Sequence, residues 1–302
     1  MGKLVSKKWS ILWVVISPYL WVSLFFLIPF FIVFKISLSN FKIGIPPYDP
    51  ILTWVSETVL ELKINLSSYL FIASDDLYYK VYLKSLGIAS LGTLGALIVG
   101  YPLAYAIAKQ PRQHHIFYLM LVLLPFWTSF LLRVYAWIGI LSPKGIINNT
   151  LLSLGWIADP LPLLYNTGTV VLGIVYCYLP FMILPLYVAL EKIDDTLIEA
   201  AFDLGARPWK VFLKIILPLS LPGVFTGCML VLIPAVGEFV IPELLGGTQT
   251  LMIGKLLWNE FFNNRDWPVA SAIAVLMLIL LVIPIALFQK LQERQTEQHH
   301  ED

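Results

Sequence analysis

Six long apolar stretches dominate this sequence and limit what it can fold into. A helix needs about 20 mostly apolar residues to cross the hydrocarbon layer of a membrane. Hydrophobic residues make up 59% of the chain and charged residues only 13%, against a usual charged share of about 25% in soluble domains. The sequence therefore predicts an all-α membrane protein with six transmembrane helices, at residues 11–36, 81–108, 116–140, 169–190, 218–242 and 268–288.

The apolar stretches differ from soluble helices in their proline content. Proline interrupts a helix in water, but membrane helices tolerate it because neighbouring groups satisfy the freed carbonyl oxygens. The first stretch is longer than a signal peptide and lacks a small-residue cleavage site, so we expect a retained helix there. Residues 37–80 mix apolar and polar side chains without reaching the length of a span, and predict a short helix or an irregular cap.

The distribution of lysine and arginine predicts the orientation of the spans. With the N-terminus in the cytoplasm, the four cytoplasmic segments hold eleven Lys and Arg residues in 58 positions, and the three outer segments hold six in 96. Cytoplasmic loops of membrane proteins carry the excess of positive charge. We therefore expect residues 1–10 and 289–302 to be cytoplasmic tails on either side of a membrane domain at 11–288.

The chain has no residue pattern typical of an enzyme. The phosphate-binding pattern G-x-x-x-x-G-K-[ST] is absent, as are H-E-x-x-H and G-x-S-x-G. Cys177 and Cys228 lie in apolar stretches without a nearby histidine, and predict buried thiols instead of a disulfide or a metal site. The histidine pairs at 114–115 and 299–300 lie in short polar segments and are expected at the surface. No catalytic residue, metal ligand or nucleic-acid-binding surface is predicted.

The most structured polar segment lies between the fourth and fifth stretches, at residues 191–217. Residues 194–196 are Asp, Asp and Thr, which are good helix starters. Gly205 is suited to end that helix, and Pro208 is suited to the first turn of a second one. The segment therefore predicts a short helix, a sharp turn and a second helix at the cytoplasmic surface. One face of the first helix is formed by residues at helical spacing, namely Leu197, Ala200, Ala201 and Leu204.

This segment also carries a long spaced motif. Glu199, Ala200 and Ala201 are followed after three residues by Gly205, after nine more by Ile215, and after one more by Leu217 and Pro218. At every fixed position this spacing resembles the loop signature of permease subunits of bacterial ABC importers. An ordinary amphipathic helix at a membrane surface is the alternative interpretation, but it requires no such spacing.

The resemblance covers nearly the whole chain, and it implies both a specific fold and a role for the loop. It implies the type I ABC importer permease (MetI-like) fold, in which the loop at 191–217 forms a coupling helix that docks on a cytoplasmic ATPase. In that role, the small Ala200 and Ala201 permit close approach, Glu199 offers a carboxylate to the ATPase or to the loop's own backbone, and Gly205 supplies the turn.

The family also implies a set of partners. They are a second, homologous permease subunit that forms a heterodimer with this chain, two ATP-binding subunits and a periplasmic binding protein, all assembled at the bacterial inner membrane. The chain itself is expected to bind no cofactor, because ATP is used by the partner ATPase. Membrane lipid is the remaining expected contact.

Four further stretches resemble permeases for polyamine uptake: 123–137, 180–194, 233–247 and 261–272. The third and fourth are most similar to the putrescine branch, since the spermidine branch tends to lack a glutamate at the place of Glu238. Spermidine, another amine or an amino acid stays open as the solute, because the binding protein largely selects it. A membrane scaffold without transport activity is a rival from another class.

A polyamine carries two or more ammonium groups, so its route needs carboxylates or aromatic faces. Ionisable residues within spans usually face a cavity or a partner. The candidates for the solute path are Trp127, Tyr135, Glu238 and Glu243, with interfacial or structural roles as the alternative. Arg133 lies at nearly the depth of Glu238, and is expected either to pair with a carboxylate such as Glu238 or to extend towards the membrane surface.

Overall fold

The computed structural model describes residues 16–56, 59–248 and 250–298. The chain divides into two compact units. One comprises the described residues up to Asp76 together with Leu257–Ile279, and the other comprises Leu77–Leu256 together with the described residues from Leu280 onward. Within the described residues, five apolar helical stretches are long enough to cross a membrane and a shorter one lies at Trp267–Val282, which confirms the expected fold class. The five are Ile16–Ser37, Asp76–Ala108, Phe130–Ser153, Thr167–Glu191 and Pro208–Val236.

The first unit contains a membrane helix and a small irregular layer. A short π-helix η1 (Ser23–Leu27) leads into α2 (Ile28–Ser37), and a two-stranded antiparallel sheet of β1 (Leu52–Ser56) and β2 (Val59–Leu62) follows. Next come α3 (Ser67–Ser74), the short π-helix η4 (Asn259–Asn263) and the start of α14 (Trp267–Gln298). The short helix expected in 37–80 is present as α3, and the hairpin of β1 and β2 is an addition that the sequence did not predict.

Short polar contacts hold the first unit together. The Ser37 hydroxyl lies 2.7 Å from the Tyr69 hydroxyl and joins the end of α2 to α3. Asp266 accepts a 3.0 Å hydrogen bond from the Val269 amide, so it caps the first turn of α14. Tyr48 and Phe261 both pack near the Trp267 ring, with ring centres 6.1 and 4.9 Å away respectively.

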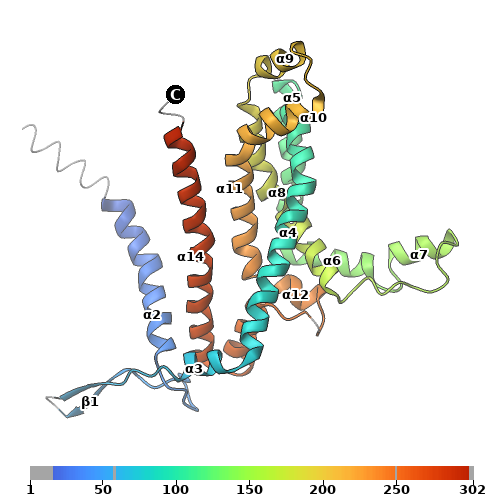
Figure 1. The fold of residues 1–302 in the computed structure, drawn as a ribbon. Coiled ribbons are helices and arrows are strands. Elements are labelled where there is room, and N and C mark those ends of the chain that lie inside the picture. Colours follow the sequence, from blue (N-terminus) through green and yellow to red (C-terminus); the bar gives the residue numbers. More distant parts are fainter. Residues whose placement is uncertain (1–15, 57–58, 249, 299–302) are drawn as a thin grey trace, which may run out of the picture. The chain divides into compact units, whose positions relative to one another are not determined.

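The second unit is a helical bundle. Its long helices are α4 (Asp76–Ala108), α5 (Arg112–Leu123), α6 (Phe130–Leu141), α8 (Thr167–Glu191) and α11 (Leu217–Val236). Its short elements are η2 (Leu124–Trp127), α7 (Ile146–Ser153), α9 (Asp195–Asp203), α10 (Pro208–Val211), η3 (Phe212–Ile216), α12 (Val240–Leu245) and α13 (Ile253–Trp258). In Figure 1, α9 and α10 lie at one end of α8 and α11, and α12 lies at the other.

Close packing between α8 and α11 forms the centre of this bundle. A Cβ on Gly223 would lie 2.5 Å from the Ala189 Cβ and 2.7 Å from the Pro185 carbonyl oxygen, so glycine is required for this approach. Small residues at helix interfaces are a general device for packing membrane helices. The Tyr101 hydroxyl of α4 lies 2.8 Å from the Ser220 hydroxyl of α11, which adds a buried polar link.

The structure corrects two of the predicted spans. The third was expected to be continuous over 116–140, but the helix stops at Leu123 and begins again at Phe130. Pro125 lacks an amide hydrogen, and Thr128 adopts an extended backbone, so the ladder of helical hydrogen bonds breaks there. The fifth was expected to reach 242, but α11 ends at Val236.

Candidate functional site

Helix α9 forms where the sequence predicts it. Asp194 precedes the helix, and its carboxylate accepts a 3.0 Å hydrogen bond from the Thr196 amide. This bond holds the pKa of Asp194 below its usual range. Gly205 has a φ of 78° and turns the chain after the helix, and Pro208 begins α10. The expected order of helix, glycine turn and second helix is confirmed.

The two faces of α9 have different surroundings. Ile198 is buried, and half-buried Ala201 packs against the same core cluster. Ala201 therefore faces partly inward, although the sequence predicts it on the same face as the exposed Ala200. The outer face carries Glu199 and Ala200, both exposed, and Glu199 has no hydrogen-bond or ion-pair partner among the described residues.

Large apolar side chains also remain uncovered around α9. Leu204 is 89% exposed at the end of the helix. Leu197, Phe202 and Trp209 are exposed as well. We refer to these three residues and Leu204 as the α9 apolar surface, although Trp209 belongs to α10. Exposed apolar side chains of this kind mark a contact surface for another protein or for a membrane.

The remaining signature residues divide between the turn and the core. Gly205 is exposed, and Pro218 is exposed in the first turn of α11. Ile215 in η3 and Leu217 at the start of α11 are half-buried against the core cluster. The motif thus combines an outward part on α9 with an inward part that anchors the loop to the bundle.

A polar cavity of about 690 Å³ lies beside α9. Its wall includes the ends of α4 and α8 and the beginnings of α5 and α9, through residues that include Arg112, His115, Glu191 and Asp194. Lys109 and Asp195 form an ion pair across it, which ties the end of α4 to α9. The position of α9 is therefore fixed by charge as well as by packing.

Buried His115 joins α5 to α8 next to this cavity. Its Nε2 lies 2.7 Å from the Gln110 carbonyl oxygen, which only accepts, so Nε2 carries the proton and donates. The Tyr187 hydroxyl lies 2.8 Å from Nδ1, and a Glu191 carboxylate oxygen lies 3.6 Å from the same nitrogen. The expectation that His115 is a surface residue was wrong. The helical spacing of His115, Leu119 and Val122, which all face inward, is the signal that identifies it.

Glu238 lies at the opposite end of the bundle and is only 7% exposed. One carboxylate oxygen accepts backbone hydrogen bonds of 3.1, 2.9 and 3.4 Å from Phe239, Val240 and Ile241. The other accepts from the Tyr178 hydroxyl. Glu238 therefore caps the first turn of α12, with its negative charge towards the positive end of the helix.

Both predictions for Arg133, a carboxylate partner or extension to the membrane surface, were wrong. It is 8% exposed, so it does not extend to the surface, and it makes no ion pair with Glu238 among the described residues. Its guanidinium instead lies 4.7 Å from the Phe126 ring centre and 5.6 Å from that of Phe130. Aromatic faces attract cations, so these rings partly replace a counter-charge. Its Nε and Nη1 have no hydrogen-bond partner among the described residues.

The other three candidates for the solute path make no hydrogen bond or ion pair with Glu238 among the described residues. Trp127 is 83% exposed in η2, and Tyr135 on α6 is also exposed. Glu243 on α12 forms a 2.9 Å ion pair with Lys255, whose ammonium also donates to the Gly247 carbonyl oxygen at 3.2 Å. The structure thus brings together Tyr178 and Glu238, and leaves the two aromatic candidates uncovered.

Sequence and structure comparisons place this geometry among known proteins. The family described as binding-protein-dependent transport system inner membrane component matches residues 11–298. The spermidine/putrescine transport system permease protein PotB of Escherichia coli K12 is 42% identical over 214 residues, which cover 71% of this chain and 78% of the relative. PotB of Haemophilus influenzae is 36% identical over 298 residues, which cover 98% and 99%.

Solved transporters share the fold at low sequence identity. A chain of a bacterial alginate ABC transporter, in complex with an alginate pentasaccharide-bound periplasmic protein, gives a TM-score of 0.72 at 16% identity over 98% of each chain. The inward-facing MetNI methionine ABC transporter gives 0.52 at 18% identity, over 70% of this chain and 93% of that one. Since the family match extends over almost the full sequence and a relative aligns from end to end, this chain belongs to the binding-protein-dependent transport system inner membrane component family.

Proposed function

We propose that this chain is the permease subunit of an ATP-driven polyamine importer, and that α9 docks on a cytoplasmic ATPase. The observation that carries the proposal is the α9 apolar surface, on and next to the same short helix that exposes the unpartnered carboxylate of Glu199. A chain without an ATP-binding motif needs a partner to supply energy, and this surface is where the loop signature also lies.

Polyamines are the proposed solute, with putrescine the first choice. The relatives at 42% and 36% identity are named for spermidine and putrescine transport. Within the chain, Glu238 and Glu243 already have internal partners, so Trp127 and Tyr135 are the stronger candidates for contact with the ammonium groups. Cation–π contacts of this kind contribute about 0.5–2 kcal/mol each.

The proposed assembly contains a second permease subunit, two ATP-binding subunits and a periplasmic binding protein. ATP-driven closure of the ATPase pair moves α9, and the two permeases then rock to alternate access, as in other transporters built from paired helical bundles. This scheme requires residues 191–217 and both chain ends to be cytoplasmic. Labelling of an Asp203→Cys variant, at an exposed position of α9, from the cytoplasmic side but not from the outer side supports it, and the reverse result refutes it.

The docking role is tested by co-purification with the ATPase. The double variant Leu197→Ser/Leu204→Ser removes two members of the α9 apolar surface, and we expect it to insert normally but to lose the ATPase. The matched control is Leu154→Ser, because Leu154 is also exposed but follows α7. Retention of the ATPase by the double variant contradicts the docking assignment.

The solute is tested by uptake of radiolabelled putrescine and spermidine into vesicles that contain the assembled importer. We expect ATP-dependent uptake of putrescine, reduced by an excess of unlabelled polyamine. Uptake of an amino acid alone identifies an importer of another small solute. Absence of any uptake, with the ATPase bound, favours a scaffold.

A further inference from the structure

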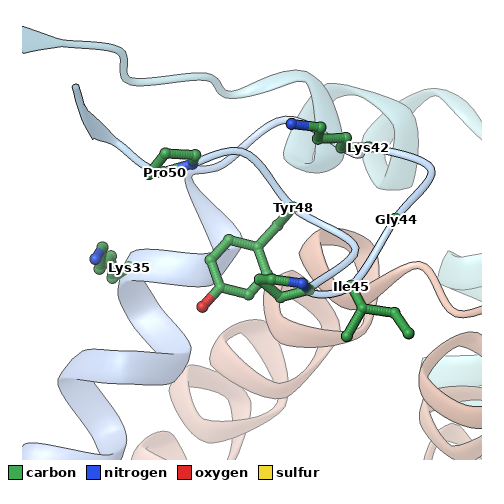
Figure 2. Close-up of a pocket in the computed structure, with 7 residues that line it drawn as sticks. Lys35, Lys42, Gly44, Ile45, Tyr48 and Pro50 are labelled. Carbon is green, nitrogen blue, oxygen red and sulfur yellow. The ribbon is translucent and has the colours of Figure 1, made fainter. Parts of the chain in front are cut away.

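A small hollow lies next to the end of α2, in the first unit of the chain (Figure 2). It measures about 330 Å³, and its wall comprises Lys35, Lys42, Gly44, Ile45, Pro46, Tyr48 and Pro50. Lys35 belongs to the last turn of α2, and the other residues belong to the loop that follows. A bridge between Phe41 and Tyr48 and a 3.0 Å hydrogen bond from the Asp49 amide to the Asn40 carbonyl oxygen close this loop.

The hollow carries an excess of positive charge. Lys42 lies 3.5 Å from an Asp49 carboxylate oxygen, which offsets one ammonium group. Lys35 has no ion-pair partner among the described residues, so one positive charge is not compensated. Tyr48, half-buried in the same wall, adds a hydroxyl that can donate a hydrogen bond. An anion with several acceptor oxygens matches these groups.

Two isoleucines beside the lysines are almost completely uncovered. Ile43 is 92% exposed and Ile45 is 96% exposed. Two large apolar side chains exposed in one short loop indicate a contact surface for a membrane or a protein. The boundary between lipid headgroups and acyl chains covers apolar side chains and leaves adjacent lysines at the phosphates.

The position of the loop agrees with such a contact. The helix at Ile16–Ser37 is one of the membrane-spanning candidates, and only 11% of its most apolar stretch is buried within the chain. Lys35 is two residues from the end of that helix, so its ammonium lies at the level of the headgroups. A protein with acidic and apolar side chains would match the same groups, but the position of Lys35 at the end of an apolar helix favours the lipid.

We propose that this hollow binds the phosphate of an anionic phospholipid, and that Ile43 and Ile45 insert into the membrane beside it. The loop then anchors the end of α2 to the membrane surface. The inference depends on the membrane location of α2 and not on the solute or on the ATPase, so failure of either proposal leaves the other unaffected.

The test uses the assembled importer in nanodiscs, with Ile45→Cys labelled by an environment-sensitive fluorophore. We expect its emission to shift to the blue as phosphatidylglycerol replaces phosphatidylcholine, and to be quenched by brominated acyl chains. The same label at Ile64→Cys, which is exposed in the same unit, is the control and should stay unquenched. Both labelled complexes must match the wild type in yield and in unfolding temperature.

The lysines are tested in the labelled protein. Lys35→Gln should raise the phosphatidylglycerol fraction at half-maximal shift about fivefold, the usual effect of one cation at an anionic membrane surface. Lys63→Gln, whose lysine pairs with Glu61 outside the hollow, should leave it unchanged.

Three results overturn the proposal. A label that stays in water at every lipid composition excludes membrane insertion. A response to inorganic phosphate but not to phosphatidylglycerol identifies a site for free phosphate. A shift that appears only when the binding protein is added identifies a protein-docking loop.

Discussion

Glu199 and Glu238 lie in the same helical bundle, and their surroundings are opposite. Glu199 is exposed on α9 and has no hydrogen-bond or ion-pair partner among the described residues. Glu238 is buried, and its two oxygens accept hydrogen bonds from three backbone amides and the Tyr178 hydroxyl. One carboxylate is available to another molecule, while the other is fully used within the chain.

The difference shows why a charged residue in a membrane protein does not by itself identify a solute site. A buried carboxylate needs compensating donors, and a helix start supplies several of them at once. Glu238 has such donors and therefore stabilises the turn between α11 and α12. Glu199 has no hydrogen-bond or ion-pair partner among the described residues of its own chain, so we expect substitution of Glu199 to alter partner binding and not folding.

The largest expected effect comes from Gly205, which turns the chain at the end of α9. Gly205→Val places a β-branched side chain at a φ of 78°, a conformation that costs an L-residue about 1–2 kcal/mol. We expect α9 to change direction and uptake to fall to background, with normal membrane insertion. Gly155→Val is the control, since Gly155 has a φ of 70° and open space around it but lies outside the loop. Equal loss of uptake in both variants would show a general folding defect.

Substitution of Glu238 separates a structural role from a solute role. Glu238→Ala removes the carboxylate that accepts hydrogen bonds from the backbone amides and from Tyr178. Leaving such buried donors unpaired costs about 1–3 kcal/mol or more. We therefore expect a lower unfolding temperature of the purified complex. Glu238→Gln keeps the side-chain carbonyl oxygen and should recover most of the stability. If Glu238→Gln instead preserves stability fully but raises the KM for putrescine severalfold, Glu238 contacts the solute and the comparison fails.

The exposed carboxylate is tested by charge reversal. Glu199→Lys should lower uptake and ATPase stimulation about tenfold while the KM for solute stays the same, because it places a cation on the docking face without a change inside the chain. Asp203→Lys makes the same charge change at another exposed position of α9. If both variants transport equally poorly, net charge near the loop matters and Glu199 has no specific role.

Several features could be predicted because local chemistry determines them. The start of α9 at Asp194, the turn at Gly205 and the start of α10 at Pro208 each depend on the conformational preference of one residue. The number of apolar helices follows from the length needed to cross a membrane. The family signature added the interpretation of the loop as a docking element.

Contacts between distant residues could not be predicted in the same way. Tyr178 and Glu238 are 60 residues apart, and His115 and Tyr187 are 72 apart, so only the packed bundle reveals these pairs. Arg133 was expected to find a carboxylate or the surface, yet it stacks on Phe126, only seven positions before it. The helix breaks at Pro125, and the Phe126 ring that follows packs against Arg133 of α6. The predicted continuous helix over 116–140 did not include this break.

The smallest expected effect concerns the cap of α9 and sharpens the view of this helix as a rigid docking element. The Thr196 amide lowers the pKa of Asp194 in the folded state, so the cap is present above the usual carboxyl pKa and is lost as pH falls through the lowered value. Near neutral pH, Asp194→Ala should speed hydrogen exchange in the first turn of α9 and reduce uptake less than Glu199→Lys does. Asp194→Asn keeps an acceptor oxygen and should exchange like the wild type near neutral pH. At a pH below the lowered pKa of Asp194, it should retain protection that the wild type loses. Unchanged exchange in Asp194→Ala would mean that the Lys109–Asp195 ion pair and the buried Ile198 hold α9 in place without the cap.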